Sequence, residues 1–133
     1  MLNLPRMATN AEGEAIHRLV EQAGFKVTGI DWSRIAPFWL VVEMNEKIVG
    51  CIQVCLSLPI GRIEMLSVDK DVPHITRSRI FQMLAVSAAS TLKAAGAQMA
   101  TMLISFQNKP QKKLLKKRGC VSISTGNLMA KRL

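Results

Sequence analysis

The hydrophobic pattern of the chain begins with a short extended segment, 4–8, and then changes to the period of a helix. Four apolar residues recur at the spacing of one helix face: Ile16, Leu19, Val20 and Ala23. Asn10 is a good N-cap residue and Gly24 a good stop, so these two residues bound the expected helix. Asp31 is expected to cap a shorter helical turn further along the chain.

Three runs of aromatic and β-branched residues follow, which is the composition typical of strands. They are 38–44, 48–56 and 62–68. The polar pair Asn45 and Glu46 separates the first two runs, and 59–61, which contains a proline and a glycine, turns the chain into the third. Because turns this short join antiparallel neighbours, the pattern predicts an antiparallel meander.

A second, longer helix is predicted over 78–95, where apolar residues again recur at helical spacing until Gly96. It lies between the strand 62–68 and another apolar extended run, 98–105. A strand, a helix and a strand in this order form a crossover, which places its two strands parallel in one sheet.

The last part of the chain predicts a basic helix and a closing hairpin. Asn108 precedes the helix, which runs to Arg118, and Gly119 stands where glycine commonly ends helices. The expected hairpin consists of 121–125, the turn Gly126-Asn127 and 128–133. Together the predicted elements describe an α+β fold with a mixed sheet.

The composition describes one compact domain over 1–133. Of the 133 residues, 49% are hydrophobic and 20% are charged, which is enough apolar material for a buried core. Three cysteines and no secretory leader favour the cytoplasm. Cys51 and Cys55 lie about 13 Å apart on a strand, too far for a disulfide, and are expected, like Cys120, to be buried. The longest nearly uncharged stretch, 48–62, is too short and too interrupted to span a membrane.

Positive charge is concentrated in the second half of the chain. Residues 1–66 hold six basic and seven acidic side chains, whereas 67–133 hold twelve basic and two acidic ones. Such a field attracts anions, whether nucleic acid, a phosphorylated cofactor or lipid. Six basic residues cluster on the last predicted helix: Lys109, Lys112, Lys113, Lys116, Lys117 and Arg118.

Three interpretations of this basic cluster stay open. It is a solvated helix face, a contact for the phosphates of a cofactor, or a patch for nucleic acid or an acidic protein. Nucleic acid is possible but not favoured, because aromatic residues make up 5% of the chain and none lies among these lysines to stack on bases.

The order of predicted elements resembles that of the GCN5-related N-acetyltransferase superfamily over nearly the whole chain. The segment 108–120, Asn-Lys-Pro-Gln-Lys-Lys-Leu-Leu-Lys-Lys-Arg-Gly-Cys, is similar to the family's Asn-x-x-Ala-x-x-Leu-Tyr-x-Lys-x-Gly-Phe. The segment 63–68, Ile-Glu-Met-Leu-Ser-Val, is similar to the strand that precedes the family's pyrophosphate loop. The resemblance implies a sheet with helices on both faces, and transfer of an acetyl group from acetyl-coenzyme A to a small-molecule or protein amine.

The resemblance also implies roles for individual residues. Glu64 is the candidate general base, with an ordinary outward-facing strand glutamate as the alternative. A backbone N–H near Leu66, where the family's strand bulges, is the expected oxyanion donor, and Val68 pairs with the pantetheine arm of the cofactor. Asn108 is also expected at the cofactor. The cofactor phosphates are expected at the loop that opens the long helix: His74, Ile75, Thr76, Arg77, Ser78 and Arg79.

Two departures from the family concern its chemistry. The family's phosphate loop contains glycines, which let the backbone approach a phosphate closely, whereas 73–79 contains none. On the alternative interpretation, Ser78 or Thr76 is only a helix N-cap and the neighbouring arginines are solvated. Leu115 occupies the position of the family's proton-donating tyrosine, and the chain has no tyrosine, so a water or Ser105 is the expected substitute.

The leading hypothesis is therefore an N-acetyltransferase, and the alternative is a catalytically inactive domain of the same fold whose basic C-terminal half engages nucleic acid or an acidic protein. No metal site is expected, because His74 has no nearby Cys, Asp or His at ligand spacing. Positive mean hydropathy and eight methionines allow a homodimer. The acceptor pocket is expected around 25–38.

Overall fold

The computed structural model describes residues 1–104, 108–123, 126 and 129–131. The chain forms two compact units, Met1–Leu103 and Ile104–Leu133. The first unit holds the central sheet and the second holds the basic helix. One domain over 1–133 stays a prediction.

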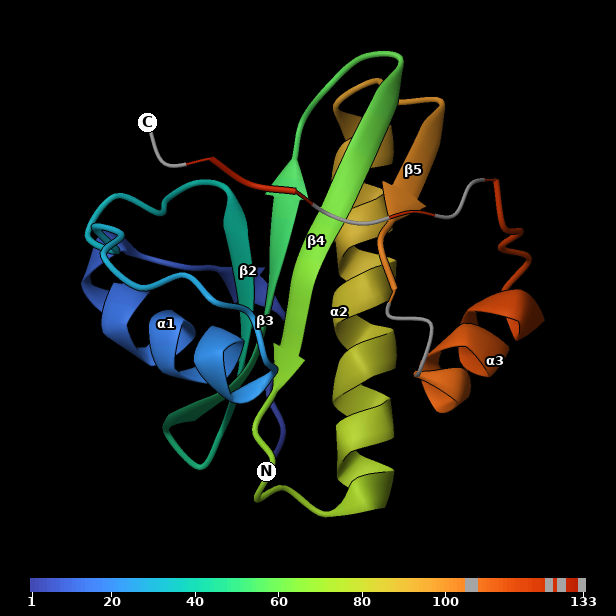
Figure 1. The fold of residues 1–133 in the computed structure, drawn as a ribbon. Helices are drawn as coiled ribbons and strands as arrows, with labels where there is room; N and C mark the ends of the chain where they lie inside the picture. The colour runs from blue at the N-terminus through green and yellow to red at the C-terminus, as the bar shows by residue number, and fades with distance from the viewer. Residues whose placement is uncertain (105–107, 124–125, 127–128, 132–133) are drawn as a thin grey trace. The chain divides into compact units, whose positions relative to one another are not determined.

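Residues 1–103 form a five-stranded sheet in the order β1-β2-β3-β4-β5 (Figure 1). The strands are β1 (Arg6–Met7), β2 (Trp39–Met44), β3 (Lys47–Cys55), β4 (Ile60–Val68) and β5 (Met99–Met102). Neighbours from β1 to β4 pair antiparallel, whereas β4 and β5 pair parallel. The predicted mixed sheet, with its meander and crossover, is confirmed.

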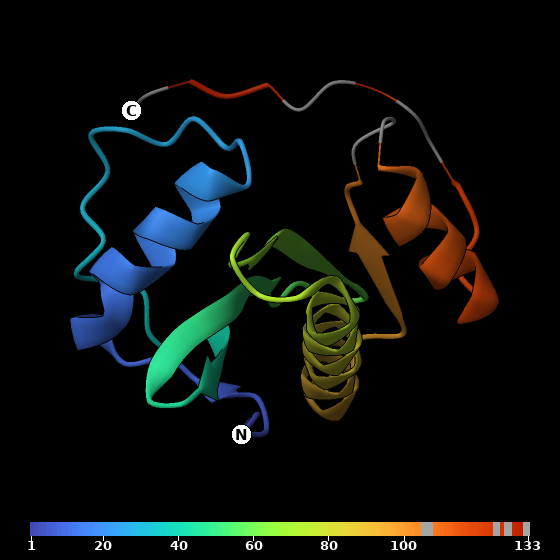
Figure 2. The ribbon, with the colours of Figure 1, turned by 90° about the horizontal axis from the view of Figure 1, so that it is seen from below.

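The helical segments of this unit are η1 (Asn10–Glu12), α1 (Gly13–Gln22) and α2 (His74–Ala94). Figure 2 shows α1 and α2 on opposite faces of the sheet, as the fold prediction requires. In the described part of the chain, no helix is long and apolar enough to cross a membrane.

The alternation of side chains along β2 supplies two cores, one under each helix. Trp39 and Val41 pack in a cluster with α1, whereas Leu40 and Val42 pack in a cluster with α2. Successive strand residues point to opposite faces, so one strand contributes to both clusters. Buried members of the α2 cluster from the other elements include Ile52, Ile63, Ile80, Leu84 and Leu92.

Two strand glycines let α2 lie close to the sheet. A Cβ atom at Gly50 would lie 2.5 Å from Cγ2 of Ile80, and one at Gly61 would lie 2.6 Å from Cδ2 of Leu92. These separations are shorter than van der Waals contact, so a larger residue would push the helix away from the sheet.

The β2–β3 hairpin turns at Asn45 and Glu46, as predicted. Their φ angles are 52° and 65°, so both residues adopt left-handed backbone. Two such residues in succession give a turn whose twist matches that of the flanking strands.

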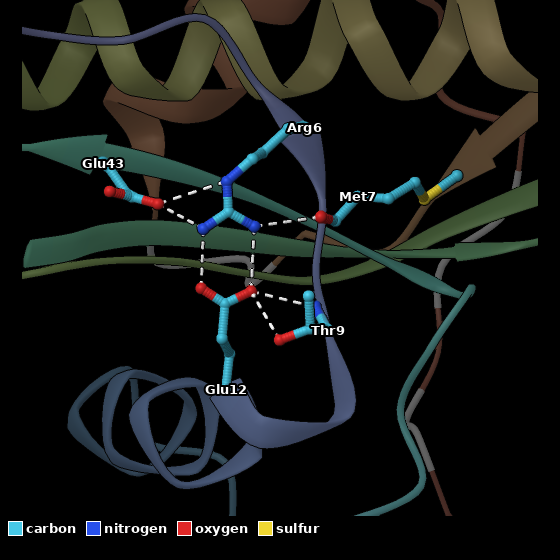
Figure 3. Close-up of polar contacts among 5 residues, drawn as sticks. All are labelled: Arg6, Met7, Thr9, Glu12 and Glu43. Carbon is cyan, nitrogen blue, oxygen red and sulfur yellow. Dashed lines mark hydrogen bonds and ion pairs between the residues drawn. The ribbon is translucent and has the colours of Figure 1, made fainter.

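Arg6 joins three elements of the first unit through its guanidinium (Figure 3). Its Nη1 and Nη2 donate to the two carboxylate oxygens of Glu12 at 2.8 and 2.6 Å, and its Nε donates to Glu43 at 3.1 Å. Nη1 also donates to the carbonyl oxygen of Met7 at 3.0 Å. The Glu12 carboxylate in turn accepts from the backbone N–H and hydroxyl of Thr9. β1, η1 and β2 are thereby held in one charged network.

The expected N-cap at Asn10 is wrong, because Thr9 occupies that position and forms a capping box with Glu12. The Asn10 side chain has another role: its Oδ1 accepts from the backbone N–H groups of Ile35 and Ala36 at 2.9 and 2.8 Å. It therefore ties the start of the first helix to the loop before β2.

Two further expectations for this region need correction. Ala23 is exposed and lies beyond the end of α1, although the other three predicted face residues are buried. No helical turn follows Asp31, whose side chain accepts from the backbone N–H and hydroxyl of Ser33 at 2.9 and 2.6 Å. Aspartate commonly makes this local turn, and the bonds from Ser33 lower the Asp31 pKa.

The second unit contains the predicted basic helix, α3 (Lys109–Lys117). Asn108 precedes the helix, as predicted, and is its N-cap, and Gly119 follows its end with a φ of 87°. The closing hairpin is not formed by the described residues 121–123, 126 and 129–131, which carry no strand. The rest of the expected hairpin, 124–125, 127–128 and 132–133, lies outside the described residues.

Replacing Arg6 with methionine is expected to lower the free energy of unfolding by about 1 kcal/mol at neutral pH, because two carboxylates lose their shared partner. Urea unfolding measures this change, with the exposed loop variant Lys26→Met as the matched control. An Arg6→Met loss no larger than that of the control would contradict a stabilising role for the network.

This difference in stability is expected to depend on pH. The hydrogen bonds from Arg6 are the main cause that lowers the Glu12 pKa from its ordinary 4.5 to about 2. A lowered carboxyl pKa contributes stability that is fully present above the unfolded pKa and is lost as the pH falls through the folded one. The gap between the native chain and Arg6→Met should therefore narrow as the pH falls from 4.5 to 2.

Candidate active site

A β-bulge interrupts β4 at Met65. Cys51 of β3 pairs with Ser67 of β4, and Gln53 of β3 pairs with Glu64, so β4 has one more residue than β3 between these two pairs. Met65 carries the irregular backbone, with a φ of 55°. A non-glycine residue in this region of backbone space is uncommon and is typical of a bulge that redirects a strand.

The bulge changes which way the following side chains point. Before it, Gly61 and Ile63 face α2. Met65 packs against the cluster under α1, although simple alternation from Ile63 would place it on the α2 side. After it, Leu66 and Val68 pack against the α2 cluster. The expected bulge near Leu66 is therefore present, one residue earlier.

β4 loses its parallel neighbour just before the bulge. The pairing with β5 runs from Ile60 and Met99 to Ile63 and Met102, and β4 continues to Val68 without it. Figure 1 shows the two strands ending at different heights, with β4 running on towards the start of α2. Among the described residues, no strand pairs with this side of β4 over 64–68, so it can pair with another extended chain.

Glu64 is the first residue of β4 beyond the pairing with β5, and its side chain lies on the sheet face opposite to that of Ile63. Its side chain is 25% exposed, and its carboxylate lies 3.7 Å from Nε of Arg62. Across the β3–β4 pair it lies opposite Gln53. The carboxylate is half-buried and retains contact with solvent, which leaves room for a proton to reach it.

The cysteines near this carboxylate are not activated nucleophiles. Burial raises the pKa of Cys51 to about 12, and burial together with the charge of Glu64 raises that of Cys55. Both are therefore thiols at neutral pH. Cys51 is buried as predicted and Cys55 is partly buried, but Cys120 is exposed, so the expectation that Cys120 is buried is wrong.

The expected phosphate loop at 74–79 is not a loop, because α2 already begins at His74. The first helical bond runs from the N–H of Arg77 to the carbonyl of Pro73, at 2.9 Å. The N–H groups of His74, Ile75 and Thr76 precede it and have no acceptor within the helix. Proline fixes the backbone angle at the entry and favours this early start. The alternative that Thr76 or Ser78 caps the helix is thereby wrong.

The first turn of α2 carries no acidic residue and is largely exposed. At about 100° per residue, His74, Arg77 and Ser78 share one side of the helix, whereas Ile75 and Arg79 share another. Thr76 is half-buried, and Ile75 is 80% exposed. The structure thus brings together one arginine, not two, with the histidine and the serine.

A buried aspartate, which the sequence analysis missed, holds the turn between β4 and α2. The Asp69 backbone donates to Val49 at 2.8 Å, and its side chain accepts from the N–H of Asp71 at 3.0 Å. Its carboxylate lies 3.2 Å from Nζ of Lys47 and 3.9 Å from Nη1 of Arg18. The Asp71 N–H, followed by these cations, lowers the Asp69 pKa. Asp-x-Asp before a proline is a turn signal that would have identified it.

An aromatic group from the loop 23–38 lies on the same face as Met65. The ring of Trp32 stacks on His17 with centroids 5.1 Å apart, and meets Trp39 edge-on at 5.7 Å. Trp32, Trp39 and Met65 belong to one cluster. The loop expected to form an acceptor pocket is therefore packed onto the sheet beside the bulge.

In the second unit, Asn108 uses its side chain to cap α3. Its Oδ1 accepts from the N–H of Gln111 at 3.2 Å, and its Nδ2 donates to Oε1 of the same residue at 3.0 Å. Leu115 is half-buried on α3, and Ser105 lies outside the described residues. No group of three or more possible metal ligands occurs in the part of the chain that the structure describes.

The change Asp69→Ala is expected to lower the free energy of unfolding by about 2 kcal/mol, because the turn bond and the ion pairs of a buried carboxylate with exposed cations are lost together. Asp69→Asn keeps an acceptor for the Asp71 N–H and should lose about half as much. Urea unfolding tests this, with Asp31→Ala, which removes an exposed turn of the same kind, as the control. Equal losses at the two sites would contradict an anchoring role for Asp69.

No family model matches the sequence, and no curated protein matches it. Solved structures do match. An aminoglycoside N-acetyltransferase in complex with coenzyme A is 15% identical, with a TM-score of 0.76 over 100% of this chain and 96% of that one. A Mycobacterium tuberculosis protein in complex with coenzyme A is 19% identical, with a TM-score of 0.75 over 96% and 77%.

A third match is diaminobutyrate acetyltransferase from Paenibacillus lautus, in complex with L-2,4-diaminobutyric acid and coenzyme A. It is 13% identical, with a TM-score of 0.73 over 89% of this chain and 74% of that one. These identities are low, but the three likenesses cover between 89% and 100% of this chain. The chain has the fold of the GCN5-related N-acetyltransferases.

Proposed function

We propose that the chain is an N-acetyltransferase that moves the acetyl group of acetyl-coenzyme A to a primary amine. The observation that carries this proposal is the bulge at Met65, placed where β4 has lost its pairing with β5. An open strand edge accepts an extended amide chain by backbone hydrogen bonds. The pantetheine arm of coenzyme A is such a chain, and Val68 is its proposed partner.

The bulge also supplies the proposed oxyanion donor. Irregular backbone directs an N–H group away from the regular ladder, and we assign the N–H near Leu66 to the carbonyl oxygen of the thioester. A donor held by the sheet needs no rearrangement as negative charge develops on that oxygen. This preorganisation is the usual source of a large part of acyl-transfer catalysis.

The start of α2 fits the phosphates of the cosubstrate. Three backbone N–H groups, at His74, Ile75 and Thr76, precede the first helical bond, and the helix dipole adds positive potential there. Arg77 supplies a charge-assisted donor on the side that also carries His74 and Ser78. The segment has no glycine, but the side chain of Ile75 points out to solvent and therefore does not block access to these N–H groups.

Glu64 is the proposed general base. Transfer forms a bond between the amine nitrogen and the acetyl carbon and breaks the bond from that carbon to sulfur. The amine must lose a proton, which Glu64 accepts directly or through water, and the departing thiolate gains one from water. Because thiolate is a good leaving group, the missing tyrosine slows this step without preventing it. Asn108 and Arg79 stay proposed cofactor contacts.

The proposed acceptor is a small-molecule or protein amine. Among the matched structures, one is named for aminoglycosides and another holds a diamino acid. Trp39 pairs with Gln53, and Gln53 pairs with Glu64. Glu64 therefore lies on the sheet face that carries the largely buried cluster of His17, Trp32 and Trp39. The Glu64 carboxylate, which retains contact with solvent, would attract a cationic amine.

Calorimetric titration is expected to show micromolar binding of acetyl-coenzyme A at physiological ionic strength. ADP, which has the pyrophosphate but no thioester arm, should bind more weakly. Arg77→Ala should weaken acetyl-coenzyme A binding roughly tenfold through loss of a charge-assisted hydrogen bond. The exposed Arg34→Ala is the control. Undetectable binding by the native chain would overturn the proposal and favour a binding module of the same fold.

Glu64→Gln is expected to reduce kcat for amine acetylation at least tenfold while leaving acetyl-coenzyme A affinity unchanged, because glutamine cannot accept the proton. Release of free thiol from acetyl-coenzyme A, measured with a panel of polyamines and aminoglycosides, reports the rate. Glu14→Gln, an exposed substitution on α1, is the matched control. An unchanged rate would remove Glu64 from the mechanism.

A further inference from the structure

The lysines of α3 form one continuous face. Five lysines lie on the same side of the helix: Lys109, Lys112, Lys113, Lys116 and Lys117. The last four follow Lys109 by three, four, seven and eight residues, which is the spacing of one helix face. All five side chains are exposed. At 1.5 Å per residue this lysine face is about 12 Å long.

Almost the entire net charge of the protein belongs to this unit. Residues 104–133 hold eight basic side chains and no acidic one, whereas residues 1–103 hold ten basic and nine acidic ones. The formal net charge of the whole chain is +9, so the sheet unit is nearly neutral. The net positive charge is therefore concentrated in the last thirty residues of the chain.

The arrangement is unfavourable for an isolated helix. Lys109 and Lys113, and Lys113 and Lys117, stand four residues apart, a spacing at which like charges repel each other across one turn. A solvated helix usually alternates the sign of its charges, but no acidic residue of this unit interrupts the lysine face. A ligand with closely spaced negative charges would relieve the repulsion.

We propose that the lysine face of α3 binds the phosphate backbone of a nucleic-acid duplex, independently of the proposed acetyl transfer. A duplex carries one negative charge per about 1.7 Å of its axis, so about seven charges lie along the ~12 Å of this face. Coenzyme A, by contrast, presents only a few phosphates at one end. Lysine contacts phosphate as a point charge, which gives affinity without sequence selection.

The same residues argue against other polyanions. Single strands are held by base stacking on aromatic side chains, and residues 108–133 contain none. Helices that lie in a lipid surface expose a broad apolar face, whereas α3 has only Leu114 and Leu115, both half-buried. Binding to the backbone of a duplex requires neither aromatic side chains nor a broad apolar face. The scarcity of aromatic residues, which argues against single-strand binding, therefore does not argue against duplex binding.

Fluorescence anisotropy with a 20-base-pair DNA duplex, titrated with the full chain between 50 and 200 mM KCl, tests the proposal. The logarithm of the affinity is expected to fall linearly with that of the salt concentration. Its slope is expected to be between about −3 and −4.5, or roughly −0.9 for each phosphate contacted. The same strand without its complement should bind at least fivefold more weakly.

The deciding variant replaces four lysines of the face: Lys109→Gln, Lys113→Gln, Lys116→Gln and Lys117→Gln. It should lose at least tenfold in duplex affinity at 100 mM KCl, with a slope reduced by about 3. The matched control removes the same charge from exposed positions of the first unit: Lys26→Gln, Arg34→Gln, Lys70→Gln and Lys93→Gln. It should change the affinity less than threefold, because the contacts of the lysine face are kept.

If the fourfold variant fails to fold, Lys113→Gln with Lys117→Gln replaces it and should reduce the slope by about half as much. Four outcomes would overturn the proposal: no binding at 50 mM KCl, equal losses in the two fourfold variants, tighter binding of the single strand, or tighter binding of anionic lipid vesicles than of duplex. Displacement of duplex by saturating acetyl-coenzyme A would also overturn it, because the lysine face would then serve the cosubstrate.

Discussion

One extra residue in β4 is the constraint on which the candidate site depends. Because β4 must fit one residue more than β3 between two fixed pairs, Met65 adopts left-handed backbone and the strand is redirected. Pairing with β5 ends at Ile63, and the start of α2 follows the redirected end of the strand. Asp69 then fixes the turn into α2 with a buried carboxylate. An open edge, a bulge and a helix start thus arise within one stretch of chain.

The electrostatics of the protein differ between its two units. In the sheet unit, charges are balanced and act at short range, as in the network of Arg6 with Glu12 and Glu43 and in the ion pair of Asp69 with Lys47. The second unit has only positive charge. Local chemistry and long-range attraction of anions are therefore properties of different parts of the chain.

Local sequence patterns predicted the order of the elements. They failed where the role of a residue depends on partners far along the chain. The β2–β3 hairpin and the end of α3 were predicted correctly, because asparagine and glycine tolerate the left-handed backbone that these turns require, here at Asn45 and Gly119. Asn10 was mistaken for a cap because its real partners, the N–H groups of Ile35 and Ala36, lie far along the chain. The predicted start of the second helix, residue 78, lies four residues after the start of α2 at His74. The spacing of apolar residues cannot reveal a first helical turn that is exposed.

The sequence by itself determined the order of the main strands and helices up to α3, most of the buried face of α1, and that the net positive charge lies in the last thirty residues. It also pointed to Glu64 and to the strand around Leu66 through their likeness to a family motif. Only the tertiary structure decided the register of β3 on β4, the bulge at Met65, and the burial of Asp69. These features depend on hydrogen bonds and packing between segments far apart in the chain, and periodicity carries no information about such partners.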